Sequence, residues 1–320
     1  MQPLILDLIV FTLLVAVELL YFRVANHYNI IDKPNERSSH SRITLRGGGV
    51  IFYFGALAFF ITYGGAYPWF ILGLTLITLI SFADDVRSIS QTVRLLFHFS
   101  AMALMFFELG FFGMPLWYMV PALILSTGII NAYNFMDGIN GITGGYSLVV
   151  LAALGYINCC EVGFTDPALI RMLIAAVLVF NIFNFRKKAK CFAGDVGSVG
   201  IAFSILFLIG QLMVASGDFS YIILLVVYGV DSVLTVIHRV LLRENIGLPH
   251  RKHLYQIMAN ELKIPHVLVS LAYMVVQALV MVGFFMIQPE FHYYYLAASI
   301  VLLSYLYIKF MRRYFHLHVY

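Results

Sequence analysis

The chain has 320 residues, of which 62% are hydrophobic and 11% are charged, with a formal net charge of +4. A soluble globular protein carries about 25% charged residues, so the composition excludes an ordinary soluble domain, and we expect no nucleic-acid partner. The three cysteines have no metal-ligand spacing, which argues against a zinc site.

Eleven apolar runs predict eleven transmembrane helices, because each is close to the length of about 20 residues that spans a bilayer. The first run has no basic segment or small-residue cleavage site, so we expect a membrane span and not a cleaved signal peptide. We therefore expect an all-α polytopic membrane protein in which 1–320 form a single integral-membrane domain. The runs cover 3–25, 48–64, 67–83, 92–110, 114–133, 142–159, 168–185, 199–216, 219–238, 265–288 and 291–310.

Basic residues predict the orientation of these spans, because Lys and Arg are retained on the cytoplasmic side. Nineteen of the 20 Lys and Arg residues fall on the side that holds the loops after spans 1, 3, 5, 7 and 9, and Arg171 alone falls on the other. We therefore expect the N-terminus outside and five polar loops in the cytoplasm. Within the first span, we expect Glu18 to pair with a basic or amide group.

The first of the five loops, 32–50, reads "DKPNERSSHSRITLRGGGV". Its three glycines allow a backbone to approach a ligand closely. A solvated basic loop held near anionic lipid is the alternative interpretation.

The second loop, 81–90, reads "SFADDVRSIS" and places Asp84 beside Asp85 at the end of an apolar span. Two adjacent carboxylates repel each other unless a cation lies near them. A solvated helix end accounts for one of them, whereas the pair favours metal or proton chemistry.

The third loop begins at "NAYNFMDGIN", residues 131–140. On a helix, Asn131, Asn134 and Asp137 share one face, where amides can bind a nucleobase or phosphate and a carboxylate can hold a cation. Helix capping before glycine explains one of these polar residues but not all of them.

The fourth loop, 184–200, reads "NFRKKAKCFAGDVGSVG". Its basic run fits a positive-inside anchor. Asp195 lies between glycines just before an apolar helix, and the N-terminus of a helix favours phosphate. A carboxylate at that point suits Mg²⁺ that bridges to the phosphate.

The fifth loop, about 239–264, contains "PHRKHLYQ". His250 and His253 flank Arg251 and Lys252, a cluster that favours an anionic ligand such as a diphosphate. A basic juxtamembrane segment bound to lipid headgroups is the alternative. Together the five loops predict Mg²⁺-dependent phosphoryl transfer, and the membrane setting indicates a lipid substrate.

These five motifs, in this order and over the whole chain, resemble the polyprenyl-phosphate N-acetylhexosamine-1-phosphate transferases, glycosyltransferase family 4. "ADD" resembles the paired-aspartate motif of the family, "NAYNFMDGINGI" its NxxNxxDGxDG motif and "FAGDVGS" its FMGDxGS motif. Each motif is weak alone, and the five are specific jointly. Two positions differ from the family pattern, since Ser88 and Asn140 stand where the family often has Asp.

The resemblance implies roles for residues at matching positions. Catalytic roles are implied for Asp84, Asp85, Asp137, His250 and His253. Substrate-binding roles are implied for Asn131, Asn134, Asn184, Arg251, Lys252, and for Asp231 and Arg239 in "VDSVLTVIHRV". Mg²⁺, with Mn²⁺ as a substitute, is expected at Asp195 with help from Asp84 or Asp137.

The resemblance also implies a reaction, in which a UDP-N-acetylaminosugar gives its sugar 1-phosphate to polyprenyl (undecaprenyl) phosphate and UMP leaves. "PHRKH" is similar to the branch that starts O-antigen and capsule repeats in the bacterial inner membrane, and a homodimer is common in the family. Asp84 or Asp85 could act as a base, and a two-step route through an aspartyl-phosphate stays open.

Three other classes of membrane protein remain as alternatives. An ion-coupled transporter would place its ionisable residues near the midplane, whereas most of the candidates here lie at one face. A CDP-alcohol phosphotransferase would need a DGxxAR spacing, and residues 137–142 read "DGINGI". A structural scaffold would not need carboxylates in three separate loops.

Overall fold

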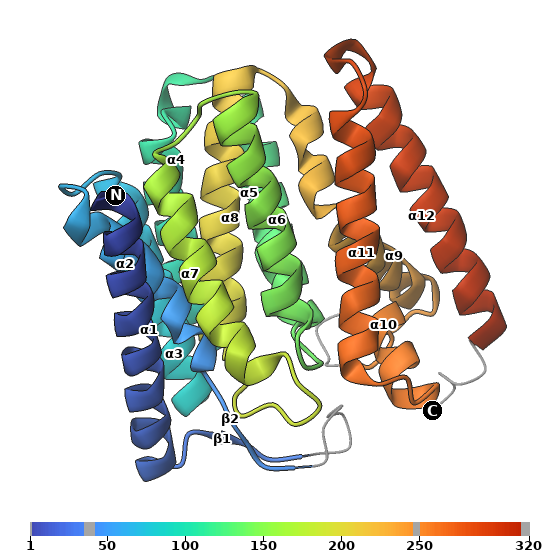
Figure 1. Cartoon of the computed structure of the whole chain (residues 1–320). Helices are drawn as coiled ribbons and strands as arrows, with labels where there is room; N and C mark the ends of the chain where they lie inside the picture. Colours follow the sequence, from blue (N-terminus) through green and yellow to red (C-terminus); the bar gives the residue numbers. More distant parts are fainter. Residues whose placement is uncertain (1, 35–41, 246–249, 315–320) are drawn as a thin grey trace.

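The computed structural model describes residues 2–34, 42–245 and 250–314. Nearly every element in it is a helix, and each of the eleven apolar runs coincides with one (Figure 1). The helices are α1 (Gln2–His27), α2 (Ile51–Thr62), α3 (Pro68–Val86), α4 (Gln91–Glu108), α5 (Leu116–Met136), α6 (Ile142–Cys160), α7 (Pro167–Asn184), α8 (Gly194–Ser216), α9 (Val226–Leu241), α10 (Leu254–Gln256), α11 (His266–Phe285) and α12 (His292–Tyr314).

Nine helical stretches among the described residues are long and apolar enough to cross a membrane. The other two expected spans, α2 and α4, are helical as well. The prediction of an all-α polytopic membrane protein is therefore confirmed, and the chain is a multi-pass membrane protein.

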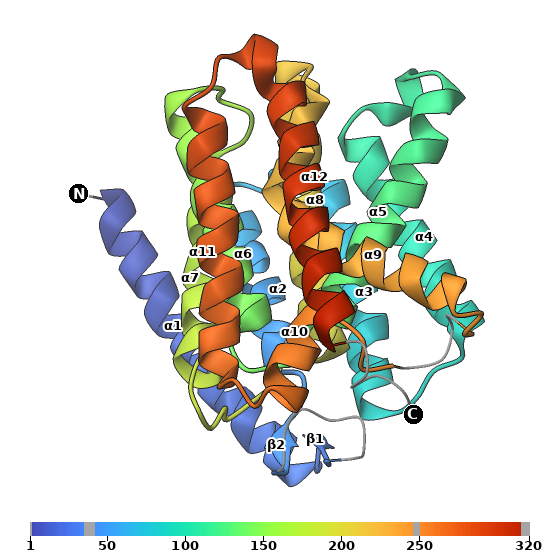
Figure 2. The ribbon, with the colours of Figure 1, turned by 90° about the vertical axis from the view of Figure 1, so that its right-hand side faces the viewer.

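Helix α8 lies in the middle of the bundle and packs against α2, α3, α5 and α6 (Figure 2). Apart from Asp195 and Gln211, its residues are apolar or small all round, and a helix without a polar face is stable only when it is buried. It begins at Gly194, earlier than the apolar run predicts, because the polar segment 194–198 is already helical. This early start places Asp195 in the first turn of a central helix.

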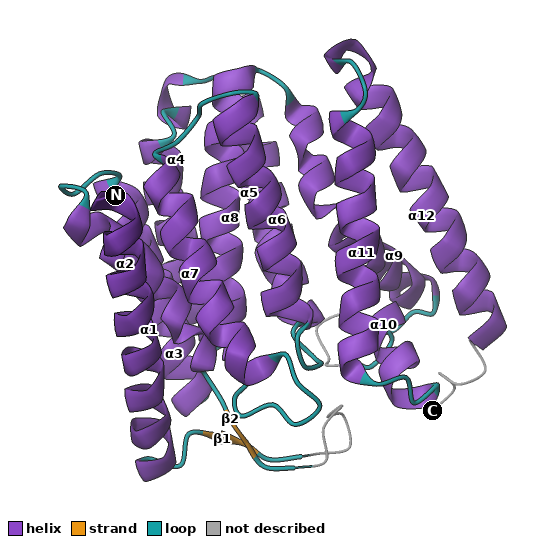
Figure 3. Ribbon diagram, viewed as in Figure 1, coloured by secondary structure: helices purple, strands orange, loops and turns teal. Residues whose placement is uncertain are grey.

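A small ribbon at one end of the bundle joins the first and fourth loops (Figure 3). Strand β1 (Ile31–Asp32) pairs with β2 (Thr44–Leu45), and Leu45 also forms a parallel bridge with Cys191. The backbone then continues the contact, since Gly49 N–H donates to the Ala193 carbonyl at 3.1 Å. Backbone hydrogen bonds alone therefore hold together segments that are about 145 residues apart in the sequence.

Two glycines allow the first loop to touch the start of α8. A Cβ on Gly49 would come within 2.3 Å of the Gly197 Cα, and a Cβ on Gly197 within 2.6 Å of the Gly49 Cα. Real Cβ atoms do not approach backbone so closely, so the glycine pair is required for this packing.

The opposite end of the bundle carries the exception to the charge pattern. Arg171 pairs with Asp7 at 2.9 Å, so its charge is matched there.

The prediction for Glu18 is wrong: the Cys191 thiol donates to its Oε1 at 3.6 Å, and Oε2 has no hydrogen-bond partner in the described chain. Cys191 reaches Glu18 because the ribbon brings the fourth loop against α1.

Candidate active site

The end of α3 meets the start of α8 through Asp85. The Asp85 carboxylate accepts hydrogen bonds from the backbone N–H groups of Asp195, at 3.0 Å, and Val196, at 2.9 Å. Its side chain is fully buried and pairs with Arg46 Nε at 2.6 Å. A carboxylate is stable at a helix N-terminus, where N–H groups are free and the dipole is positive. Asp85 therefore fixes the first turn of α8 in place.

Two arginines join the carboxylates of the second and fourth loops into one cluster. Arg46 Nη2 lies 3.2 Å from Asp195, and Arg94 Nη2 lies 3.2 Å from the same carboxylate. Arg94 Nη1 also pairs with Asp84 at 2.7 Å. We call Arg46, Asp84, Asp85, Arg94 and Asp195 the acid–arginine cluster. A planar guanidinium group binds a carboxylate and a phosphate with the same paired hydrogen bonds. A substrate phosphate can therefore replace a carboxylate as the partner of either arginine.

Neither arginine was predicted from the sequence as a site residue, because both were counted as topology-determining cations. The available signal was position: Arg46 directly precedes the glycine triplet, and Arg94 lies in the first turn of the helix that follows the aspartate pair.

The third loop brings Asp137 towards the acid–arginine cluster. Asp137 ends α5 and accepts a 2.6 Å hydrogen bond from the Thr143 hydroxyl. Burial raises its pKa to about 7, with smaller contributions from the negative charges of Asp195 and Asp85, while the Thr143 hydrogen bond lowers it. The carboxylates of Asp85 and Asp195 therefore act electrostatically on Asp137.

The two asparagines of this motif differ in their surroundings. Asn134 Oδ1 accepts a hydrogen bond of 3.4 Å from the Ser198 hydroxyl on α8, whereas Asn131 is exposed. Asn134 therefore links α5 to α8, and Asn131 is the accessible member of the pair.

Asp231 holds the fifth loop in place. It is 2% exposed and accepts hydrogen bonds from the Tyr273 hydroxyl at 2.6 Å and the Leu254 N–H at 3.0 Å. His253 Nδ1 lies 3.3 Å from it, and His253 Nε2 is buried with no hydrogen-bond partner in the described chain. This network fixes the ring of His253 and leaves one nitrogen for a ligand.

The rest of the histidine motif is mostly neutral or internally paired. Burial lowers the pKa of His250 to about 3, and nearby His253 and Arg239 lower it further, so its imidazole is uncharged at neutral pH. Lys252 pairs with Glu244, and Arg239 pairs with the same carboxylate at 3.2 Å. Arg239 is 3% exposed, and its ion pair with Glu244 holds the segment that follows α9 in place.

Asn184 and Asn140 tie the third and fourth loops together. Asn184 is buried, accepts from the Gly141 N–H at 2.7 Å and donates to the Cys191 carbonyl at 2.8 Å. Asn140 donates to the Arg186 carbonyl at 2.9 Å. Both amides bond to backbone, so the structure favours a positioning role for Asn184.

Tyr255 packs the fifth loop directly on the third. Its hydroxyl donates to the Phe135 carbonyl at 2.7 Å, and a Cβ on Gly138 would come within 2.2 Å of that hydroxyl. We expect Gly138→Ala to lower thermal stability and activity, because either the ring or the loop must move. In a Tyr255→Phe background the same change should cost less, since the nearest remaining ring carbon lies 3.1 Å away. Equal losses in the two backgrounds, measured by thermal unfolding, would contradict the contact.

Comparison with known proteins agrees with this arrangement. The family model described as "Glycosyl transferase family 4" matches residues 67–214, the segment that contains Asp84, Asp137 and Asp195. A probable undecaprenyl-phosphate N-acetylglucosaminyl 1-phosphate transferase of Bacillus subtilis (strain 168) is 29% identical over 256 residues, covering 73% of this chain and 70% of the relative.

A second relative is the undecaprenyl-phosphate alpha-N-acetylglucosaminyl 1-phosphate transferase of Escherichia coli (strain K12). It is 31% identical over 212 residues, covering 58% of this chain and 56% of the relative, so the match spans just over half of its length. The phospho-N-acetylmuramoyl-pentapeptide-transferase of Symbiobacterium thermophilum is 34% identical over 130 residues, 40% of this chain and 37% of the relative. The matched segment contains the carboxylate motifs, so the chain is similar to glycosyl transferase family 4 over residues 67–214.

Proposed function

We propose that this membrane protein transfers the sugar 1-phosphate of a UDP-N-acetylaminosugar to undecaprenyl or another polyprenyl phosphate. The observation that carries the proposal is the acid–arginine cluster, which joins carboxylates of two loops beside Asp137 of a third. Relatives named as undecaprenyl-phosphate N-acetylglucosaminyl 1-phosphate transferases support it. The positive-inside pattern supports a reaction on the cytoplasmic side of the bacterial inner membrane.

The reaction is a single displacement at phosphorus. An oxygen of the polyprenyl phosphate attacks the β-phosphorus of the UDP-sugar, and the bond from that phosphorus to the bridging oxygen of UMP breaks. UMP leaves with the electron pair, and a polyprenyl-diphosphate-sugar forms. Catalysis of such a transfer consists mostly of positioning and charge neutralisation.

The nucleophile needs no strong base. The second pKa of a phosphate monoester is about 6, so it is mostly dianionic at neutral pH. Asp85 is already bound by two N–H groups and by Arg46. We therefore favour direct attack by the lipid phosphate, with Asp85 as a positioning residue, over an aspartyl-phosphate.

The residues present fit a magnesium ion. Among the described residues no three His, Cys, Asp or Glu side chains form a complete metal cage, but Mg²⁺ usually takes one or two carboxylates together with substrate phosphates. Asp195 would hold it, with Asp84 or Asp137, and Mn²⁺ could replace it because both prefer oxygen ligands. When bound, the ion would neutralise the diphosphate.

The remaining residues divide between the two ends of the donor. Asn131 and Asn134 would contact the nucleotide side, and His250, Arg251 and His253 would hold phosphates. A neutral His250, and a His253 Nε2 with no partner among the described residues, suit hydrogen bonding to a phosphate better than a charge interaction. The motif "PHRKH" favours an initiating step of O-antigen or capsule synthesis.

The state of Asp137 predicts a pH dependence. Its pKa of about 7 means that it is partly protonated at neutral pH, and a protonated carboxyl does not bind a cation. We expect kcat/KM to fall as the pH drops below about 7. Thr143→Val removes the hydrogen bond that lowers this pKa, so the fall should begin at a higher pH.

The Thr143→Val profile is compared with that of Ser204→Ala, which removes a buried hydroxyl that bonds to its own helix. Ser204→Ala should keep the wild-type profile. If Thr143→Val also keeps it, Asp137 does not control the acid limb. Stability should change with pH in the opposite direction to activity. Because the pKa of Asp137 is higher in the folded state than in the unfolded chain, the free energy of unfolding should fall as the pH rises from about 4 towards about 7.

The function is tested with isolated membranes, a panel of UDP-N-acetylaminosugars and polyprenyl phosphate. We expect Mg²⁺-dependent UMP release together with transfer of sugar label into lipid. Movement of a solute across the membrane without UMP production would instead favour a transporter.

A further inference from the structure

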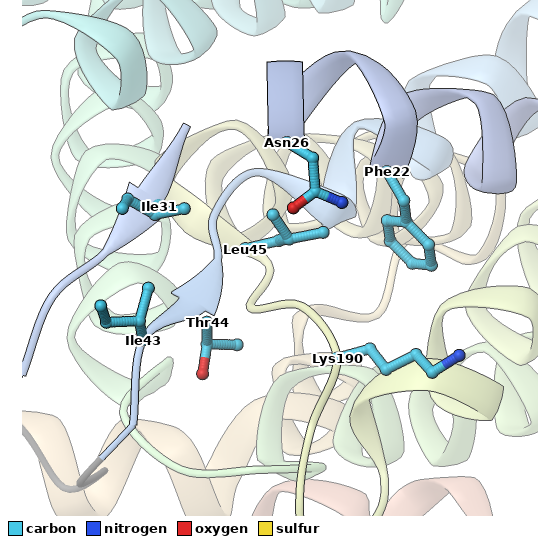
Figure 4. Close-up of a pocket in the computed structure, with 7 residues that line it drawn as sticks. All are labelled: Phe22, Asn26, Ile31, Ile43, Thr44, Leu45 and Lys190. Atoms are coloured by element: carbon cyan, nitrogen blue, oxygen red, sulfur yellow. The ribbon is translucent and has the colours of Figure 1, made fainter. Parts of the chain in front are cut away.

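A cavity of about 400 Å³ lies beside the ribbon, on the side of β2 that faces α1 (Figure 4). Phe22 and Asn26 of α1 form one wall, and residues of the ribbon and the fourth loop form the rest. None of the proposed transferase residues lines it. Among the residues that the structure describes, its lining consists of Phe22, Asn26, Ile31, Ile43, Thr44, Leu45 and Lys190.

The lining combines a polar part with an apolar part. Asn26, Thr44 and Lys190 offer an amide, a hydroxyl and an ammonium group, and none of the lining residues in the described part of the chain is acidic. Within the described chain no carboxylate lies within 4 Å of the Lys190 ammonium, which sits 5.8 Å from the centre of the Phe183 ring. The remaining four side chains are aliphatic or aromatic. Such a lining favours an anion that carries a hydrocarbon part.

The position of the cavity in the bundle further limits the class of ligand that it can bind. Phe22 and Asn26 belong to the last turns of the α1 span, Leu4–His27, so the cavity opens where that span ends. Lys190 closes the basic run 186–190, which carries four positive charges. Basic pockets at the ends of membrane helices bind anionic lipid headgroups.

We propose that this cavity binds the headgroup of one anionic phospholipid, with the phosphate held by Lys190 and Asn26 and the glycerol and upper acyl chain against Phe22 and Leu45. The site is separate from the acid–arginine cluster but adjoins it. The Phe192 N–H donates to the Leu45 carbonyl at 2.8 Å, and the next residue after Leu45 is Arg46. A bound lipid would therefore brace strand β2, which Arg46 directly follows.

The test measures binding and does not depend on the proposed transferase activity. The full chain is reconstituted in vesicles of phosphatidylcholine and phosphatidylglycerol in equal amounts, extracted gently and examined by native mass spectrometry. We expect one retained phosphatidylglycerol per wild-type chain. Lys190→Gln should reduce this retention about tenfold, because a charged hydrogen bond contributes roughly 1.5 kcal/mol. Asn26→Leu should weaken it as well.

Lys188→Gln is the matched control, since Lys188 lies in the same basic run, is exposed and does not line the cavity. It should retain the lipid as the wild type does. Equal losses in Lys190→Gln and Lys188→Gln would show diffuse attraction to the membrane surface and overturn the site. Displacement of phosphatidylglycerol by polyprenyl phosphate, or by inorganic phosphate alone, would overturn the assignment to a structural phospholipid.

Discussion

Asp195→Asn is expected to reduce the rate of UMP release by about a thousandfold, the upper range for removal of one preorganised electrostatic group. The amide keeps the size of the side chain and can still accept from Arg46, which lies 3.2 Å away. What it loses is the negative charge that would hold the cation on the diphosphate. The loss should appear in kcat at saturating Mg²⁺ and not only in the Mg²⁺ requirement.

Asp166→Asn is the control for this change, because Asp166 is also a carboxylate at a helix N-terminus. It caps α7 through a 2.8 Å bond from Ala168 N–H, away from the acid–arginine cluster. We expect its activity to match that of the wild type. An Asp195→Asn enzyme within threefold of the wild type would remove Asp195 from the chemistry.

Arg46→Lys is expected to lower kcat/KM about a hundredfold although the charge is kept. Arg46 reaches Asp85 through Nε at 2.6 Å and Asp195 through Nη2 at 3.2 Å. A guanidinium can satisfy both carboxylates at once, whereas an ammonium group is a point charge on a flexible stem. The two carboxylates should then repel each other, and the first turn of α8 should be less well fixed.

Arg87→Lys makes the same change directly after α3, where Arg87 is exposed and follows the aspartate pair. It should leave kcat/KM unchanged. Full activity in Arg46→Lys would mean that only net charge at this position matters, and the bridging role of the guanidinium would be wrong.

The sequence was sufficient to predict the helices, since apolar runs of span length have few other stable structures in a membrane. The basic residues also predict that the loops of Asp84, Asp137 and Asp195 share one side of the membrane, and the structure joins Asp84 to Asp195 through Arg94. The start of α8 was predicted late, at 199, because hydropathy does not detect a polar first turn such as 194–198.

The partners of these carboxylates could not be predicted in the same way. Asp85 and Asp195 are 110 residues apart, and only the packing of α3 on α8 shows that one caps the helix of the other. The sequence did not distinguish Arg46 from the other basic residues that determine the membrane orientation. The neutral state of His250 depends on burial that the motif alone does not reveal.

Transfer of phosphorus is the central claim, and a donor labelled with ³²P at the β-position of UDP-N-acetylglucosamine tests it most directly. Membranes containing the wild-type chain and polyprenyl phosphate should move the label into a lipid diphosphate and release unlabelled UMP, and Asp195→Asn membranes should not. Label that stays in released UDP while sugar enters lipid would show sugar transfer without its phosphate, and would contradict the proposed reaction.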